Sequence, residues 1–158
     1  MSLVEIVVGS GKLRIQDIER IKSLISPNFA LINPECVCGL LHLKQAAFLA
    51  DNAHKENYNL SKEKSTEVLL YLTFQRQISK AIQIGGINEN TKAVAWVSFG
   101  EPPIELLDII DVDDSIISGN YFDYSNMDID TSIIENSSFE DKQKIIMTKT
   151  ATLSVHTR

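Results

Sequence analysis

Hydrophobic and polar positions follow two periods along this chain, one typical of strands and one typical of helices. Short apolar runs bounded by glycine, proline or asparagine predict strands over residues 4–8, 29–32 and 93–99, with 113–117 as a further candidate. Apolar residues three or four positions apart predict helices over residues 14–24, 40–55, 65–72, 77–84, 102–109 and 139–150. This interleaving predicts an α/β fold, bordering on α+β, with a mixed central sheet flanked by helices.

Three stretches carry signals beyond the basic periods. Gly9 and Gly11 are expected to end the first strand in an ordinary turn. The run over 93–97 is apolar at nearly every position, which predicts a central strand buried on both faces. Residues 151–155 alternate strictly between apolar and polar side chains, which favours a final strand after the last helix.

Helix starts and faces can also be predicted. Ser65 or Thr66 is expected to cap the helix that follows, with Glu67 in the first turn, where the helix dipole favours a carboxylate. In the helix over 77–84, three residues are expected to face inward: Ile78, Ala81 and Ile82.

Length and charge limit the function further. The 158 residues suit one domain, spanning 1–158, and the net charge is −6. Residues 118–138 are polar and acidic, which predicts a loop or insertion. An acidic chain does not hold nucleic acid through its overall field, so any RNA contact must be local, and residues 40–92, with seven positive and five negative charges, suit it best.

Cellular location and partners follow from the same composition. The longest apolar runs are far shorter than the roughly 20 residues of a membrane helix. The start of the chain lacks the basic region and cleavage site of a signal peptide. We expect a cytoplasmic protein that binds neither membranes nor DNA.

No motif for covalent chemistry emerges. The chain lacks a phosphate-binding P-loop, a dinucleotide-binding glycine pattern and a nucleophile elbow. Cys36, Cys38, His42 and His54 could ligate a metal, but a C-x-C spacing suits buried structural cysteines better than a zinc site. We therefore expect no catalytic residue, no metal and no cofactor.

Two alternatives stay open at this stage. One is a small cytoplasmic metal- or cysteine-dependent enzyme that uses the Cys/His group. The other is a generic homodimeric interaction protein, in which a helix face of small side chains at Ala46, Ala47 and Ala50 associates with a second copy.

Three sequence blocks resemble one known family. The blocks are Leu31-Ile32-Asn33-Pro34 leading to His42-Leu43-x-x-Ala46-x-x-x-Ala50, then Glu67-x-Leu69-Leu70-Tyr71-Leu72, then Arg76-Gln77-Ile78-x-x-Ala81-Ile82 with Gly86-Ile87 behind it. In this order they resemble the kinase-binding subunit of the KEOPS tRNA-modification complex, the family of the PRPK-binding protein (TPRKB). The resemblance covers about residues 30–100.

The resemblance implies both partners and function. It implies a non-catalytic α/β subunit that binds and regulates a small PRPK-type kinase/ATPase and, through it, a TsaD-like transferase subunit. It also implies help in recruiting tRNA, including its 3′ end, for threonylcarbamoyladenosine modification next to the anticodon. Members of this family end in a helix, which conflicts with the strand signal over 151–155.

Candidate contact residues follow from these expectations. For the kinase, helical spacing predicts an apolar face of Ile146, Met147, Thr150 and Leu153, for which a core role is the alternative. For RNA, we expect phosphate contacts from the cations Arg76, Lys80, Lys62 and Lys64. Phe74 is expected to stack on a base, and the amide of Gln77 is a further candidate contact. For the lysines the alternative is a solvated face, and for Gln77 it is a buried amide.

Overall fold

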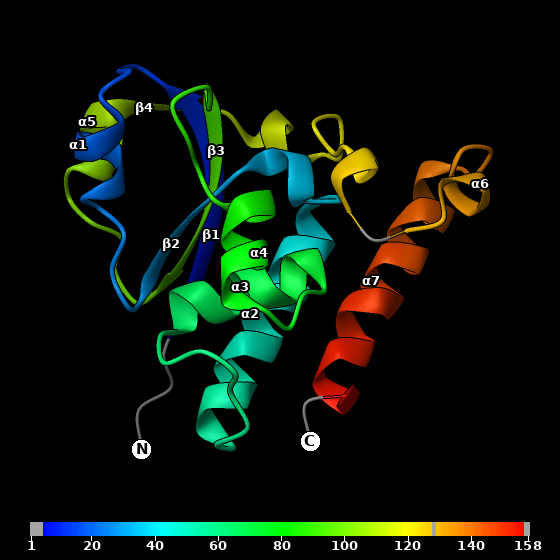
Figure 1. Ribbon diagram of the computed structural model, residues 1–158. Coiled ribbons are helices and arrows are strands. Elements are labelled where there is room, and N and C mark those ends of the chain that lie inside the picture. Colours follow the sequence, from blue (N-terminus) through cyan, green and yellow to red (C-terminus); the bar gives the residue numbers. More distant parts are fainter. Residues whose placement is uncertain (1–4, 128, 157–158) are drawn as a thin grey trace.

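A four-stranded sheet divides the computed structural model, which describes residues 5–127 and 129–156 (Figure 1). Its strands are β1 (Ile6–Leu13), β2 (Phe29–Ile32), β3 (Ala93–Phe99) and β4 (Ile110–Val112). They lie in the order β2-β3-β1-β4, and each of these pairings is antiparallel. The predicted α/β fold is confirmed, with an antiparallel sheet where a mixed one was expected. The expected strand residue Val4 lies outside the described residues.

The central strand β3 is buried on both faces, as its apolar run predicts. Ala95 and Val97 belong to one apolar core together with residues of the helices α2 (Leu40–Lys55) and α3 (Lys64–Thr73). On the other face, Trp96 belongs to a second core, which the short helices α1 (Ile18–Lys22) and α5 (Leu106–Ile109) cover. Figure 1 shows α1 and α5 on one side of the sheet and α2, α3 and α4 on the other.

Strand β1 continues through the two glycines where the sequence predicts a turn. A Cβ atom at Gly9 would lie 2.2 Å from Cζ2 of Trp96, and one at Gly11 would lie 2.6 Å from the backbone oxygen of Asp111. The glycines therefore allow a ring of β3 and the backbone of β4 to approach β1 closely. The predicted end of the strand was wrong, because these glycines make room for residues of the neighbouring strands β3 and β4 and do not form a turn.

The helices α2, α3 and α4 (Ile78–Gly85) are confirmed close to their predicted bounds. Ala46, Ala47 and Ala50 have no exposed surface, because α2 packs against α3. The small side chains that could have served a dimer are thus used inside the chain. Dimerisation through this alanine face is excluded in this fold.

The inward face of α4 is narrower than predicted. Ala81 is buried, but Ile78 and Ile82 are 40% and 48% exposed. The close approach of α3 to Gly85 explains this orientation of α4, because a Cβ atom at Gly85 would lie only 3.1 Å from a methyl group of Leu69 on α3. The contact with α3 therefore runs through Ala81 and Gly85, and the two isoleucines face outward.

The start of α3 does not use the predicted caps. Its N-cap residue is Glu63, and Ser65 is buried in the first turn. Glu67 is also buried, and its carboxylate accepts hydrogen bonds from the N–H groups of Leu60 (3.1 Å) and Ser61 (2.7 Å). Burial raises the pKa of Glu67. Glu67 lies in the first turn of α3, as predicted, and its carboxylate also fixes the loop before that helix.

The chain after β4 forms helical turns where a strand was predicted over 113–117. The segment is the 3-10 helix η2 (Asp114–Ile117). Asp113 starts it, because its carboxylate accepts a hydrogen bond of 3.0 Å from the N–H of Ser115. The helix predicted over 102–109 is likewise shorter, since only the four residues of α5 are helical.

The acidic segment 118–138 is mostly irregular, with two short helical elements. These are η3 (Tyr124–Asn126) and α6 (Thr131–Ile134). Asp123 and Asp130 accept hydrogen bonds from N–H groups two residues further on, as Asp113 does. The abundance of aspartate here therefore reflects repeated local caps.

The last element is the helix α7 (Phe139–His156), which packs on α2 and α3. The strand signal over 151–155 was wrong, and the terminal helix implied by the family resemblance is present. The segment is helical and not extended because a helix buries Ile146, Thr150 and Leu153, which are four and three residues apart, on one face. Among the residues that the structure describes, no helix combines the length and apolarity needed to cross a membrane.

Candidate functional site

The inner face of α7 holds three of the four residues predicted to contact a partner. Ile146 and Thr150 have no exposed surface, and Leu153 is 5% exposed. Ile146 lies in a small apolar core with Cys38 and Ile134. These side chains therefore position α7 on the rest of the chain, and Met147, which is half-buried, is the predicted residue nearest the surface.

A chain of buried hydrogen bonds locks this inner face in place. The N–H of Cys38 donates to Nδ1 of His42 (3.0 Å), so Nε2 carries the ring proton and donates to Oγ1 of Thr150 (2.9 Å). The Thr150 hydroxyl then donates to the backbone oxygen of Tyr71 (2.9 Å). Burial lowers the pKa of His42 to about 3, so the ring is neutral near pH 7.

The outer side of the same helix pair carries exposed apolar side chains. Leu41 and Phe48 of α2 are 59% and 63% exposed, and Gln45 lies between them on the same helix face. The Gln45 amide donates to the backbone oxygen of Met147 (2.8 Å), which joins α2 to α7. We call this surface the outer α2/α7 face and define it by Leu41, Gln45, Phe48, Met147, Thr148 and Ala151.

A shallow groove of about 610 Å³ runs along the outer α2/α7 face. Its lining residues are Gln45, Lys144, Met147, Thr148, Ala151 and Thr152. Large exposed apolar residues beside such a groove are typical of protein-binding surfaces. Leu41 and Phe48 were not predicted as contact residues, although large apolar side chains outside the alanine face of an amphipathic helix indicate an exposed apolar surface.

Four of the predicted RNA contacts gather where α3 meets α4. Arg76, Gln77 and Lys80 are exposed, and Gln77 is the N-cap residue of α4, so its amide is not the buried one allowed by the sequence. Phe74 ends α3 in a left-handed conformation (φ 43°) and is half-buried. Its ring lies under Nζ of Lys149, at 5.9 Å from the ring centroid. Phe74 therefore already packs within the chain.

The other two predicted RNA contacts lie at the opposite end of α3. Lys64 is the first residue of that ten-residue helix, which is about 15 Å long. Its ammonium group lies 2.8 Å from the Asp51 carboxylate and 5.1 Å from the centroid of the Phe99 ring. Lys62 is exposed. The six candidates thus form two separate groups, and Lys64 is occupied by an internal ion pair.

The cysteines and histidines do not form a reactive cluster. Burial raises the pKa of Cys36 to about 12 and that of Cys38 to about 11, so both stay protonated thiols near neutral pH. Within residues 5–127 and 129–156, no group of three or more His, Cys, Asp or Glu side chains could hold a metal ion.

Comparison with known proteins identifies a family for this chain. The sequence model of the family described as kinase binding protein CGI-121 matches residues 13–148, which is most of the chain. The match includes α2, the α3–α4 junction and α7 as far as Thr148, and it ends before Thr150 and Leu153. No curated protein matches the chain.

Proposed function

This chain belongs to the family of kinase binding protein CGI-121, and from that premise we propose that it is the non-catalytic kinase-binding subunit of a KEOPS complex. In this role it binds and regulates the small PRPK-type kinase/ATPase and, through it, meets the TsaD-like transferase subunit in the cytoplasm. It also helps recruit tRNA, including its 3′ end, for threonylcarbamoyladenosine modification next to the anticodon.

The observation that carries the proposal is the exposed outer α2/α7 face in a chain whose family binds kinases. Phe48 and Leu41 are large apolar anchors on a rigid helix, and Met147 adds an adaptable side chain beside them. The inner side of α7 is fixed by buried contacts, so the outer side is held ready for a partner. Pre-organisation of this kind reduces the entropy lost on binding.

For tRNA, the supporting observation is the exposed group at the α3–α4 junction. Arg76 can form two parallel hydrogen bonds to a phosphate, and Lys80 lies four residues further on, about one helical turn away. The overall acidic charge makes such a contact local and strongly dependent on salt.

The kinase contact is tested by co-purification with the PRPK-type kinase. Phe48→Glu places a charge on the outer α2/α7 face, and we expect capture of the kinase to fall at least about tenfold. Ile104→Glu is the matched control, because Ile104 is 90% exposed and directly precedes the α5 region on the other side of the sheet. Equal capture by both variants would remove this face from the interface.

The tRNA contact is tested by filter binding at low salt. Arg76→Glu is expected to weaken tRNA binding roughly tenfold, because charge reversal removes one phosphate contact and adds repulsion. Lys22→Glu is the matched control on the exposed side of α1. A Lys62→Glu variant decides whether the far end of α3 also takes part. Unchanged binding by Arg76→Glu would exclude the α3–α4 junction.

A further inference from the structure

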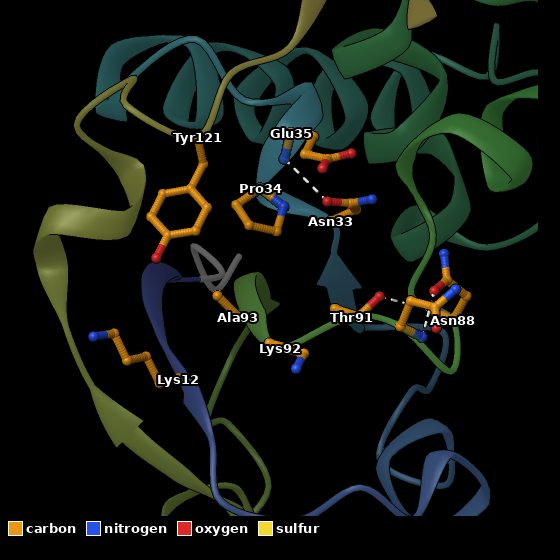
Figure 2. A pocket seen from close by; sticks show the side chains of 10 residues that line it. Lys12, Asn33, Pro34, Glu35, Asn88, Thr91, Lys92, Ala93 and Tyr121 are labelled. Carbon is orange, nitrogen blue, oxygen red and sulfur yellow. Dashed lines mark hydrogen bonds between the residues drawn. The ribbon is translucent and has the colours of Figure 1, made fainter.

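A polar pocket lies at one end of the sheet, and none of its lining residues is among the contact residues considered so far. Its volume is about 410 Å³, within the range of small-molecule sites. Its lining residues are Lys12, Asn33, Pro34, Glu35, Asn88, Asn90, Thr91, Lys92, Ala93 and Tyr121. Figure 2 shows these side chains around a common hollow, contributed by β1, β3 and three connecting segments.

The strand ladder brings two lysines together in this pocket, although they lie far apart in the sequence. Lys12 is the register partner of Ala93, and the N–H of Leu13 donates to the backbone oxygen of Lys92 (2.9 Å). Ala93 has only a methyl side chain, so it leaves open space at the bottom of the pocket between the two lysines. The Lys12 ammonium group is 3.9 Å from the carboxylate of Asp113, which shares its charge, while Lys92 is exposed.

The opposite wall is built from the short helix η1 (Pro34–Cys36) and the acidic segment. The N–H of Asp123 donates to the backbone oxygen of Glu35 (2.8 Å), which holds this segment against η1. Tyr121, 39% exposed, thereby lies beside Pro34, as Figure 2 shows. An aromatic ring next to a proline ring offers a surface against which a flat heterocycle can stack.

Two asparagines stand at the edge of the pocket in fixed orientations. The Asn33 side-chain oxygen accepts from the N–H of Glu35 (3.0 Å), and that of Asn88 accepts from the N–H of Asn90 (2.8 Å). With the oxygens engaged, the amide NH₂ groups are the donors that can meet a ligand. The carboxylate of Glu35 is an acceptor beside them.

We propose that this pocket binds one nucleotide unit. The base lies against Tyr121 and Pro34, Asn33 and Glu35 contact its polar edge, and Lys92 with Lys12 holds the phosphate. The lining fits such a ligand because its cations and its rings stand on opposite sides of the hollow (Figure 2). A base with an amino group suits Glu35 as acceptor, so adenine or cytosine is favoured over uracil.

The nucleotide unit can come from two sources, a free mononucleotide or an unpaired nucleotide within RNA. A second hollow of about 350 Å³ shares Asn33, Glu35 and Asn88 with the pocket and continues to Lys80 on α4. A single strand bound at the α3–α4 junction could therefore reach the pocket along this path. The RNA source rests on the proposed function, whereas the mononucleotide source does not.

The test is an amide-shift NMR titration of the full chain with AMP, UMP, inorganic phosphate and a short single-stranded RNA. We expect shifts at Asn33, Thr91 and Ala93, with AMP tighter than UMP and phosphate alone much weaker. Binding of AMP itself identifies a free nucleotide as a source, and binding of the RNA alone identifies a strand. No shift at these amides with either ligand, or phosphate binding as well as AMP, would overturn the proposal.

Variants separate this site from the proposed function. Lys92→Glu should weaken nucleotide binding roughly tenfold, and Tyr121→Ala should weaken it several-fold, whereas the control Lys22→Glu should not. Kinase capture should be unchanged in both pocket variants. If the pocket variants bind nucleotide as the parent chain does, the pocket assignment fails, whatever the outcome for Phe48→Glu. If Phe48→Glu retains kinase, only the proposed interface fails.

Discussion

The two sides of the α2/α7 helix pair use similar side chains for opposite purposes. On the inner side, Ile146, Leu153 and the alanines of α2 are buried against the chain's own core, and His42 and Thr150 satisfy each other there. On the outer side, Leu41 and Phe48 are mostly exposed to solvent. In the sequence, the apolar residues of the inner side cannot be distinguished from those of the outer side.

The difference shows that apolarity on a helix does not by itself locate an interface. An inner residue contributes to binding only by holding the helix in place, while an outer residue can contribute directly. Changes on the inner side should therefore alter stability, and changes on the outer side should alter association while stability stays constant.

The largest effect on the inner side should come from acid. The pKa of His42 is about 3 in the folded chain and near 6.5 when unfolded, so the unfolded state binds more protons between these values. The stability that the neutral His42 ring contributes is complete above pH 6.5 and declines on acidification towards pH 3, by about 5 kcal/mol in total. Urea unfolding between pH 7 and pH 4 measures this slope.

A His42→Asn variant is the control for that pH series. It removes the titrating ring while keeping an amide that can accept and donate, so the slope between pH 6.5 and pH 4 should flatten. An unchanged slope would mean that other groups whose pKa is lowered in the fold, such as Asp51, cause the acid sensitivity. Glu67 has the opposite effect on stability. Its pKa is raised in the folded chain, so its contribution to stability is lost as the pH rises and is not lost in acid.

Two neighbouring residues sharpen the comparison within α7. Ile146→Ala opens a cavity in a fully buried site and should lower the free energy of unfolding by about 2–4 kcal/mol. Met147→Ala, on the outer side, should lower it by less than about 1 kcal/mol. Chemical denaturation of both variants gives the two values. Similar losses at both positions would contradict the division into an inner and an outer side.

The smallest expected effect concerns a single hydroxyl group. Thr150→Val removes the hydrogen bond to the Tyr71 backbone and the partner of His42, which should lower stability by about 1–2 kcal/mol. Thr148→Val removes only an exposed bond to the Lys144 backbone and should be nearly neutral. Thermal unfolding of the pair decides, and equal melting temperatures would show that the buried chain of hydrogen bonds adds no stability.

An element could be predicted from the sequence when the interactions that determine it lie within a few residues of each other. The helix over 40–55 and the buried strand over 93–99 were predictable because their patterns repeat within a few residues. The extension of β1 through Gly9 was not, because its cause is the ring of Trp96 about 90 positions away. The helix over 151–155 was misjudged because a short alternation outweighed the burial of Thr150 and Leu153, which depends on α2 and α3.

The candidate surfaces were predictable to a lesser degree. Exposure of Arg76 and Lys80 was expected from charge alone. The ion pair that occupies Lys64 depends on Asp51 of another helix, so it was not predictable from local sequence. Phe48 was not predicted, because the apolar spacing indicated contact faces at Ala46, Ala47 and Ala50 and on the last helix, whereas the exposed surface spans the outer sides of both helices. Tyr121 enters a pocket only through the docking of the acidic segment on η1.

The central claim is that the outer α2/α7 face, and not the far side of the sheet, meets the kinase. Site-specific photo-crosslinking tests it most directly, with a benzophenone side chain placed at position 48 or at position 104 of the full chain in the presence of the PRPK-type kinase. Position 48 is expected to crosslink to the kinase and position 104 is not. A crosslink at position 104 with none at position 48 would contradict the account.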